Sequence, residues 1–285
     1  MMLDNGLSFD VEEWYDVTLL DKRLLKGVDL ERGRIVEKAS RKILSLLEKY
    51  KTKATFFVIG RMAKENPEMV RRLLAEGHEI ASHGYSHRLL NDLSKREIEK
   101  EIALSQEQLQ KITKRPILGF RAPLNAPPND LGLYFGLLKK YGFKYDSSIY
   151  PTRVGVFSGN KNFPDRIVEV DKGFFEIPLS CFSILRFKLP ISGGFYIRMI
   201  PSWMYCFMVR LRAKKDKGTI VYLHSWEMER NYPKVIKNPF KRLIQYGNDA
   251  GVERKLETML RDFRFVCLKD LLLDSTYNKD IIGSS

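Results

Sequence analysis

The stretch RIVEKASRKILSLLEKYKTKATFFVI, residues 34–59, decides the fold class. Its first part predicts a helix over about 34–50, because apolar residues recur there at helical spacing. Its last part, 54–59, is a continuous apolar and aromatic run that predicts a buried strand. With a further strand expected at 7–10, the three segments predict one βαβ unit, the building block of a parallel sheet. The periodic helical positions are Ile35, Ala39, Ile43, Leu46 and Leu47.

Start and stop signals predict further helices along the chain. An Asn, Ser or Asp side chain can accept from the free N–H groups of a first turn, proline is tolerated at the first helical position, and glycine ends helices. A Ser followed three residues later by Glu forms a capping box. The signals are Asn66 with Pro67 and Gly77, Ser94 with Glu97, and Asn129 with Gly142; a last helix is expected at 252–263.

Strands are expected between these helices, at 78–82, 117–120, 143–146, 219–223 and 264–268. Strands that alternate with helices predict a parallel sheet. We therefore expect one α/β domain over residues 1–285, a distorted (β/α) barrel with about seven parallel strands. Proline and the Gly193-Gly194 pair interrupt the segment around 151–215, which is expected to be an insertion of hairpins and loops. The end of the chain after Asp274 is expected to be a frayed tail.

Composition limits the classes of partner. The formal net charge of +14 favours an anionic partner, but Lys and Arg alternate with Glu in the helices, and no basic stripe is interleaved with aromatic residues. We therefore predict no nucleic-acid partner. Three widely spaced cysteines predict reduced core residues rather than a disulfide framework or a zinc knot: Cys181, Cys206 and Cys267.

The location of the protein is predicted from its first residues and from one apolar segment. The chain opens without the basic, apolar and cleavage regions of a signal peptide, which predicts a cytoplasmic protein. The segment from Tyr196 to Lys215 is apolar with a basic end. It is expected to be a core-facing helix whose basic end complements its dipole. The alternative is an interfacial helix in peripheral contact with an anionic membrane surface.

Five predicted strands each end in a polar residue suited to chemistry: Asp10, His83, Arg121, Asp146 and His224. Active sites of β/α barrels are built at the carboxyl ends of the strands, so residues distant in sequence meet at one mouth. Core packing alone does not account for five such residues. They predict an active site.

Two histidines and an acidic segment predict a metal site. His83 and His87 are separated by three residues, a spacing that lets both imidazoles face one ion, and Zn²⁺ is the metal such a site suits. A pair of surface or capping histidines is the alternative. The third ligand is expected after the first strand, where alternation puts Asp10 and Glu12 on one side and Glu13 on the other. A merely solvated acidic loop is the alternative there.

These motifs resemble those of the polysaccharide deacetylase family, carbohydrate esterase family four, of the NodB-homology type. The resemblance covers about the first two-thirds of the chain and returns near residue 224. The segment from Ser192-Gly193-Gly194-Phe195 to Trp226-Glu227 is similar to a branch associated with exopolysaccharide synthesis. The matching motifs are His83-Gly-Tyr-Ser-His87, Phe120-Arg121-Ala122-Pro123, Tyr145-Asp146-Ser147-Ser148 and Leu223-His224-Ser225-Trp226.

The resemblance implies a role for each polar residue. Asp10 would be the general base and Arg121 its orienting partner, while His224 would protonate the leaving nitrogen with Asp146 holding its imidazole. Most members have adjacent aspartates in the first motif, whereas this chain has Asp10-Val11-Glu12-Glu13. Some relatives place the metal carboxylate two positions after the catalytic one, so Glu12 is assigned as the ligand beside His83 and His87, with Glu13 as the fallback.

The implied function is removal of N-acetyl groups from amino sugars of a polysaccharide or glycoconjugate, by a hydrolase with a divalent metal, most simply Zn²⁺. Tyr85 is expected to line the substrate groove, and Leu223 and Trp226 to enclose the acetyl methyl group, although packing roles are the alternative for all three. Two other functions stay open: an allantoinase-like amidohydrolase acting on a small cyclic amide, and a catalytically silent glycan-binding scaffold.

Overall fold

The predicted βαβ unit is present in the computed structural model. It consists of β1 (Asn5–Val11), α1 (Arg34–Lys49) and β2 (Thr55–Val58), and β1 pairs parallel with β2 from Ser8↔Thr55 to Val11↔Val58. The structure describes residues 4–16, 22–30, 33–152, 160–184, 187–215, 218–248, 251–273 and 280–281.

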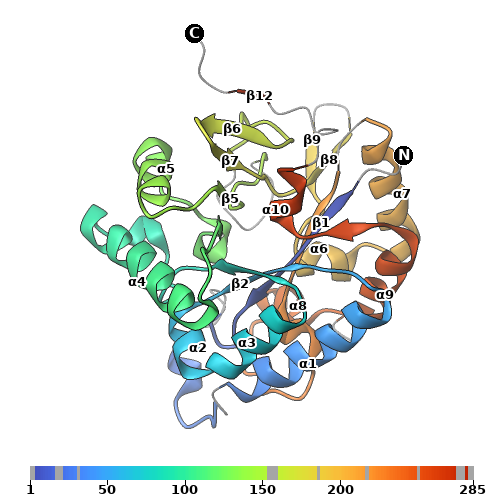
Figure 1. Ribbon diagram of the computed structural model, residues 1–285. Coiled ribbons are helices and arrows are strands. Elements are labelled where there is room, and N and C mark those ends of the chain that lie inside the picture. Colours follow the sequence, from blue (N-terminus) through green and yellow to red (C-terminus); the bar gives the residue numbers. More distant parts are fainter. Residues whose placement is uncertain are drawn as a thin grey trace.

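Seven parallel strands form the curled sheet of a distorted barrel, as the sequence predicts, in the order β10-β1-β2-β3-β4-β5-β7 (Figure 1). Antiparallel β6 and then β12 extend the β7 edge, and short β11 pairs parallel with the start of β1. The further strands are β3 (Glu79–Ser82), β4 (Gly119–Phe120), β5 (Tyr145–Asp146), β6 (Val168–Asp171), β7 (Phe174–Glu176), β10 (Ile220–His224), β11 (Phe265–Val266) and β12 (Asp280–Ile281).

Helices cover the outer face of this sheet (Figure 1). They include α2 (Gly60–Glu65), α3 (Pro67–Ala75), α4 (Lys95–Thr113), α5 (Leu131–Lys140), α8 (Pro239–Tyr246) and α9 (Val252–Asp262). By contrast, α10 (Leu268–Leu271) lies inside the curled sheet (Figure 1), where its leucines pack with Phe57 and Tyr145. Short 3₁₀ turns lie at η1 (Lys22–Leu25), η2 (Leu90–Asp92), η3 (Pro123–Asn125) and η4 (Ser225–Met228).

The capping signals were partly right. The Ser94–Glu97 capping box at the start of α4 is confirmed. The prediction that Asn66 caps α3 with its side chain is wrong, since that side chain makes no cap hydrogen bond and lies close to Gly33 instead. At α5 the cap is Asp130 rather than its neighbour Asn129, because the Asp130 carboxylate accepts from the N–H of Leu133.

The proline-rich segment contains two hairpins and two helices. The β6–β7 hairpin contributes β7 to the parallel sheet, while β8 (Cys181–Ile184) and β9 (Phe187–Pro190) form a separate two-stranded sheet. Helices α6 (Gly194–Met199) and α7 (Ser202–Ala213) then lead to β10. Residues 153–159 and 185–186 of this segment, and most of the expected tail, lie outside the described residues.

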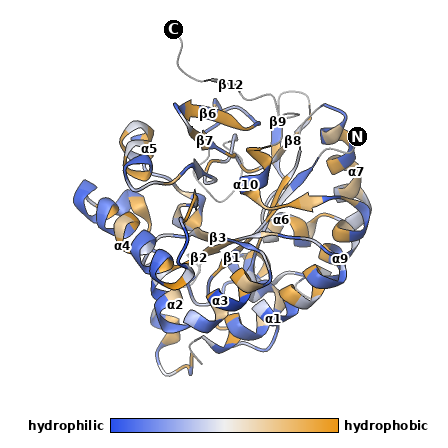
Figure 2. Ribbon diagram, viewed as in Figure 1, coloured by the Kyte–Doolittle hydropathy of each residue, from blue (hydrophilic) through white to orange (hydrophobic). Residues whose placement is uncertain are grey.

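The core lies between the sheet and the helices, and the amphipathic helices turn their hydrophobic residues toward it (Figure 2). All three cysteines are buried and none forms a disulfide, as expected. On α7, Tyr205 and Val209 face this core, but Trp203 and Phe207 are 74% and 54% exposed. The helix is therefore only half core-facing. Among the described residues, no helix combines the length and hydropathy needed to cross a bilayer.

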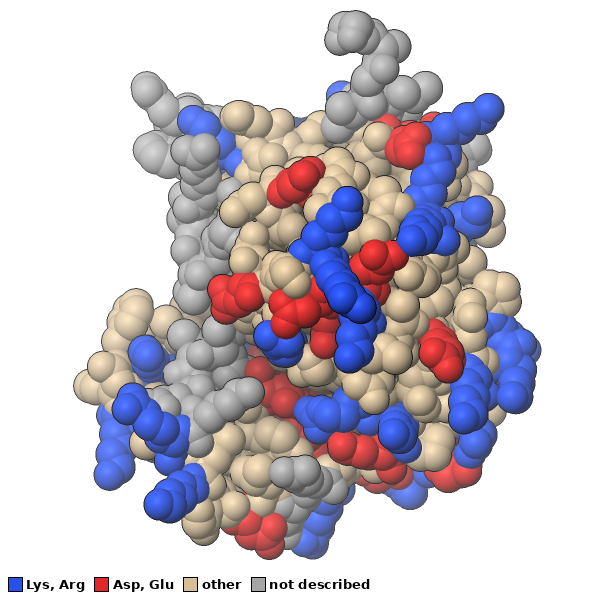
Figure 3. Space-filling model, turned by 90° about the vertical axis from the view of Figure 1, so that its left-hand side faces the viewer, with Lys and Arg blue, Asp and Glu red and all other residues tan. Residues whose placement is uncertain are grey.

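Charges of both signs are interspersed on the side of the molecule where α4 and α5 lie (Figure 3). Surface ion pairs tie these helices to each other and to the β6–β7 hairpin. Lys140 Nζ lies 2.6 Å from Glu99 Oε1, and Lys139 Nζ lies 2.8 Å from Asp171 Oδ2. This face carries the mixed pattern expected of a solvated surface.

Candidate active site

The five predicted polar residues all lie at the carboxyl end of the parallel sheet. Asp10 is the penultimate residue of β1 and pairs in register with His224, the last residue of β10. His83 and Arg121 directly follow β3 and β4, and Asp146 ends β5. The five residues thus lie at the end of the barrel where the sequence predicts an active site.

Glu12, His83 and His87 form a compact donor set for a metal ion. One ligand atom from each lies within 4.8 Å of the other two. The Nε2 atom of His87 is buried, and Glu12 Oε2 lies 2.8 Å away, yet no hydrogen bond of good geometry joins them. Two imidazole nitrogens and one carboxylate, with a buried nitrogen left without a hydrogen bond, fit a divalent cation such as Zn²⁺.

The electrostatics of this group favour a charged carboxylate beside a neutral imidazole. Burial alone would raise the pKa of Glu12, but the imidazoles of His224 and His87 outweigh it and lower that pKa to about 2. Burial lowers the pKa of His83 to about 4, despite the nearby Asp10. Burial would lower the pKa of His87, but Glu12 outweighs it and raises that pKa. A metal requires an ionised carboxylate and neutral imidazoles, so an ion bound here competes with a proton at His87.

Glu101 of α4 fixes the loop that carries the two histidines through hydrogen bonds. Its carboxylate accepts from the backbone N–H groups of Tyr85 (3.1 Å) and Ser86 (2.8 Å) and from the Ser86 hydroxyl (2.6 Å). His87 has a φ of 60°, a left-handed conformation that is uncommon for a residue with a side chain. The loop thus holds His87 in a sparsely populated conformation within the metal cluster.

Asp10 is held by Arg121 beside the metal ligands. Arg121 Nη1 donates to Asp10 Oδ1 at 2.7 Å, and the other oxygen, Oδ2, lies 4.0 Å from His83 Nε2. Arg121 is fully buried and its guanidinium also donates to Ser8 and to Ser147. This arrangement leaves one carboxylate oxygen of Asp10 directed toward the cluster.

His224 closes the site from β10. Its Nε2 lies 3.5 Å from Glu12 Oε1, and its ring stacks on Trp226 with centroids 5.5 Å apart. Trp226 Nε1 donates to the same Glu12 oxygen at 3.2 Å. The His224 side chain is 23% exposed, whereas those of Glu12 and His87 are 3% exposed. A substrate can therefore reach the His224 imidazole.

The expected contact between Asp146 and His224 is absent. Asp146 Oδ1 accepts from Tyr134 (2.9 Å) and Ser148 (2.7 Å), and Asp146 is paired in register with Glu176 of β7. Burial raises the pKa of Asp146 and raises that of Glu176 well above its usual value, which disfavours ionisation of both carboxyl groups at once. The expectation was wrong because four strands separate β5 from β10 in the sheet order.

Three other candidates lie at the edge of the site or outside it. Glu13 Oε1 accepts from the N–H of Val36, and Glu13 is not in the metal donor set. Tyr85 is half-buried and its ring packs close to Gly60. Leu223 is fully buried in the main core, because alternation along β10 points it away from the side of His224.

Sequence reasoning missed the residues that surround His224 from the far side. Glu227 Oε2 lies 3.3 Å from His224 Nδ1, and the other oxygen of Glu227 forms an ion pair with Arg198 of α6. The spacing of His224 and Glu227 around a 3₁₀ turn was a weak signal for this contact. Arg198 carries no such signal, since only the fold brings α6 beside η4.

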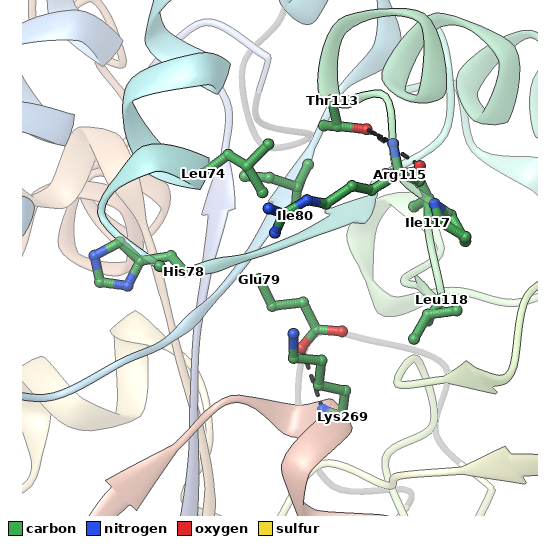
Figure 4. A pocket seen from close by; sticks show the side chains of 11 residues that line it. Leu74, His78, Glu79, Ile80, Thr113, Arg115, Ile117, Leu118 and Lys269 are labelled. Atoms are coloured by element: carbon green, nitrogen blue, oxygen red, sulfur yellow. Dashed lines mark hydrogen bonds between the residues drawn. The ribbon is translucent and has the colours of Figure 1, made fainter.

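A pocket at the opposite end of the barrel is lined by residues at the start of β3, by residues that precede β3 and β4, and by Lys269 of α10 (Figure 4). Its buried carboxylate, Glu79, accepts from Thr55 Oγ1 at 2.6 Å and from the Lys269 backbone N–H at 3.2 Å. It also accepts from Tyr145 OH at 3.0 Å. Every donor here is neutral, and both oxygens are used, as in a structural cluster.

Two family models match the chain consecutively. Residues 29–145 match the polysaccharide deacetylase model, and residues 147–273 match a model described as a domain of unknown function, DUF3473. Residues 29–145 therefore carry a polysaccharide deacetylase domain. The site draws on both matched regions, because His83, His87 and Arg121 lie in the first and His224 in the second.

Curated relatives match a limited part of the chain. A peptidoglycan-N-acetylmuramic acid deacetylase of Bacillus subtilis is 43% identical over 86 residues, 30% of this chain and 17% of the relative. A peptidoglycan-N-acetylglucosamine deacetylase of Bacillus cereus is 40% identical over 81 residues, 28% of this chain and 38% of the relative. A chitooligosaccharide deacetylase of Sinorhizobium fredii is 40% identical over 60 residues, 21% of this chain and 28% of the relative. The matches thus span less than half of these relatives.

Solved structures share the fold over nearly the whole chain. A protein from Mycobacterium smegmatis described as a polysaccharide deacetylase superimposes with a TM-score of 0.64 at 18% identity, covering 99% of this chain and 94% of the other. A pseudoenzyme of carbohydrate esterase family 4 from Bacillus anthracis gives a TM-score of 0.50 at 15% identity, covering 95% and 66%. At these identities the comparison establishes the fold.

Proposed function

We propose that the protein is a metal-dependent hydrolase that removes N-acetyl groups from amino sugars of a polysaccharide or glycoconjugate. One observation carries the proposal: a buried Glu12–His83–His87 donor set lies beside an arginine-bound carboxylate, Asp10, and the partly exposed imidazole of His224. The deacetylases among the relatives act on N-acetylated sugars, which supports this substrate class.

Glu12, His83 and His87 would hold a divalent ion, with Zn²⁺ as the proposed metal. Such an ion supplies Lewis-acid chemistry for attack on an amide carbonyl. Asp10 acts as general base and takes a proton from the attacking water on Oδ2, while Arg121 fixes its other oxygen. His224 donates the proton on Nε2 to the departing nitrogen, so that acetate and a free amine are released.

Acetate release tests the proposal directly. Zinc-loaded wild type is incubated with N-acetylated chitooligosaccharides, with peptidoglycan fragments and with a cyclic ureide. The proposal predicts acetate from an N-acetylated sugar, released on the order of 10²- to 10⁴-fold more slowly after His224→Ala. Ring opening of the cyclic ureide alone would support the allantoinase-like alternative, and glycan binding without turnover would support the silent scaffold.

We also propose a cytoplasmic location with peripheral contact at an anionic membrane surface. Exposed Trp203 and Phe207 lie one turn apart on α7, and exposed Arg210 follows on the same helix. Aromatic and basic residues on one exposed helix face are typical of interfacial helices. The proposal predicts co-sedimentation with phosphatidylglycerol vesicles that is lost in Trp203→Ala/Phe207→Ala. Equal sedimentation of wild type and variant would contradict it.

A further inference from the structure

The His224 imidazole is bracketed by two carboxylates, one at each ring nitrogen. Nε2 faces Glu12 Oε1 at 3.5 Å on the side of the metal donor set. Nδ1 faces Glu227 Oε2 at 3.3 Å, and the same oxygen accepts from the His224 backbone N–H at 2.9 Å. Trp226 stacks on the ring face. The ring is therefore restrained in both tilt and rotation.

Glu227 is itself fixed by a buried arginine. Its Oε1 forms an ion pair with Arg198 Nη1, and the two side chains are only 1% and 3% exposed. Arg198 also donates to the carbonyl oxygens of Gly247 (3.0 Å) and Ile244 (2.6 Å). A buried carboxylate needs such a partner to stay charged, and an arginine anchored at several points holds it in one place.

The first residue of α6, Gly194, leaves space for this carboxylate. A Cβ atom added to Gly194 would overlap Glu227 Oε2, so a side chain at that position would displace the carboxylate. The neighbouring Gly193 has a φ of 95°, and an added Cβ would lie 2.7 Å from the Tyr222 hydroxyl. Gly194 and Arg198 thus both fix the position of the Glu227 carboxylate, which faces His224 Nδ1.

We propose that Glu227, held by Arg198, is the residue that positions His224 for proton donation. The Glu227 carboxylate accepts from Nδ1–H and leaves Nε2 directed at the leaving nitrogen; after Nε2 gives up its proton, the neutral ring keeps the proton on Nδ1. The inference rests on the proposed function. It assigns to the region that matches a domain of unknown function the positioning carboxylate that Asp146 does not provide.

The decisive variant is Glu227→Gln. Because a guanidinium only donates, the amide oxygen of the glutamine must face Arg198, which turns its NH₂ group toward Nδ1 and disfavours the required Nδ1–H form. We expect kcat on an N-acetylated sugar to fall on the order of 10²- to 10⁴-fold with little change in KM. Hydrolysis of 4-nitrophenyl acetate, whose leaving group needs no proton, should fall less than about threefold.

The matched control is Glu229→Gln. Glu229 lies two residues further on, and its carboxylate bonds to Lys42 at 3.0 Å, away from His224. This variant should keep both rates. Equal losses on the two substrates in Glu227→Gln, or an unchanged rate on the sugar, would overturn the proposal.

A readout that needs no turnover is ¹⁵N NMR of the imidazoles, which is tractable because the chain has four histidines. At a pH where His224 is neutral, wild type should carry the His224 proton on Nδ1, and Glu227→Gln should move it to Nε2. A wild-type Nε2–H tautomer would overturn the proposal even if the variant does not fold. If no acetylated sugar is a substrate, the proposed function fails while this spectrum still decides the role of Glu227.

Discussion

The two ends of the barrel each bury a glutamate near the end of a strand, but the pKa of the two carboxyl groups is shifted in opposite directions. At the carboxyl end, Glu12 lies among His83, His87 and His224, and these imidazoles lower its pKa to about 2. At the amino end, burial raises the pKa of Glu79 to about 6, although Thr55 and other neutral donors bond to it.

The difference separates a site built for chemistry from one built for stability. Neutral donors occupy both oxygens of Glu79, so this carboxylate is not left open to an ion. The Glu12 cluster keeps basic nitrogens facing a carboxylate without good hydrogen bonds, an arrangement that a cation resolves. Burial of a carboxylate is therefore uninformative alone, and the charge of its partners identifies its role.

Glu12→Ala should have the largest effect. Loss of one of three metal ligands should weaken zinc affinity by more than about 100-fold, since even residues that only orient ligands change affinity by 10- to 100-fold. Metal analysis after dialysis, with acetate release in parallel, measures it. Glu13→Ala is the control and should keep the metal; loss of metal from Glu13→Ala but not from Glu12→Ala would show that the ligand assignment is wrong.

Asp10→Asn and His224→Ala should separate catalysis from metal binding at the same end. Each should lower kcat on the order of 10²- to 10⁴-fold, because each removes a proton-transfer group. Both proteins should still contain one equivalent of metal, since neither residue belongs to the donor set. Turnover close to wild type in either variant would remove that residue from the mechanism.

Glu79→Ala tests the opposite end. Removing the carboxylate leaves the buried hydroxyls of Thr55 and Tyr145 without their acceptor, at about 1–3 kcal/mol for each group. We expect the free energy of unfolding in urea to fall by about 2–4 kcal/mol while kcat of the folded protein is unchanged. The exposed Glu107→Ala of α4 should change stability by less than about 0.5 kcal/mol. A selective loss of kcat in Glu79→Ala would mean that both ends serve function.

The smallest effect is a pH dependence of stability. Because the pKa of Glu79 is raised from 4.5 to about 6 in the folded state, the folded protein binds the proton more tightly than the unfolded chain between these values. Stability contributed by this group is thus present at low pH and lost as pH rises through about 6. Relative to Glu79→Gln, wild type should lose up to about 2 kcal/mol between pH 4 and 7. If wild type instead gains stability relative to Glu79→Gln as the pH rises from 4 to 7, the pKa of Glu79 is not raised.

The sequence predicted the barrel and the end at which the site lies because both follow from local patterns. Helical periodicity located α1, and polar residues after apolar runs located Asp10, His83, Arg121 and His224. The partner of His224 could not be found in this way. Glu227 lies near His224 because of the turn η4, and Arg198 lies near Glu227 because of the packing of α6. Neither feature leaves a periodic signal in the sequence.

The error at Asp146 has a topological cause. Because the carboxyl ends of parallel strands converge, the sequence predicts which end of the sheet a residue occupies. It does not predict which residues are neighbours at that end. β10 lies next to β1, so His224 faces Glu12, while β5 lies next to β7, so Asp146 meets Glu176. Strand order, which local sequence does not encode, decides those contacts.

Anomalous diffraction at the zinc edge, from crystals of the zinc-loaded protein, tests the central claim most directly. The account predicts one strong peak bonded to Glu12, His83 and His87, with Asp10 and His224 on either side and outside bonding distance. A peak coordinated by Glu13, or a fully loaded protein with the ion away from the carboxyl end of the barrel, would contradict it.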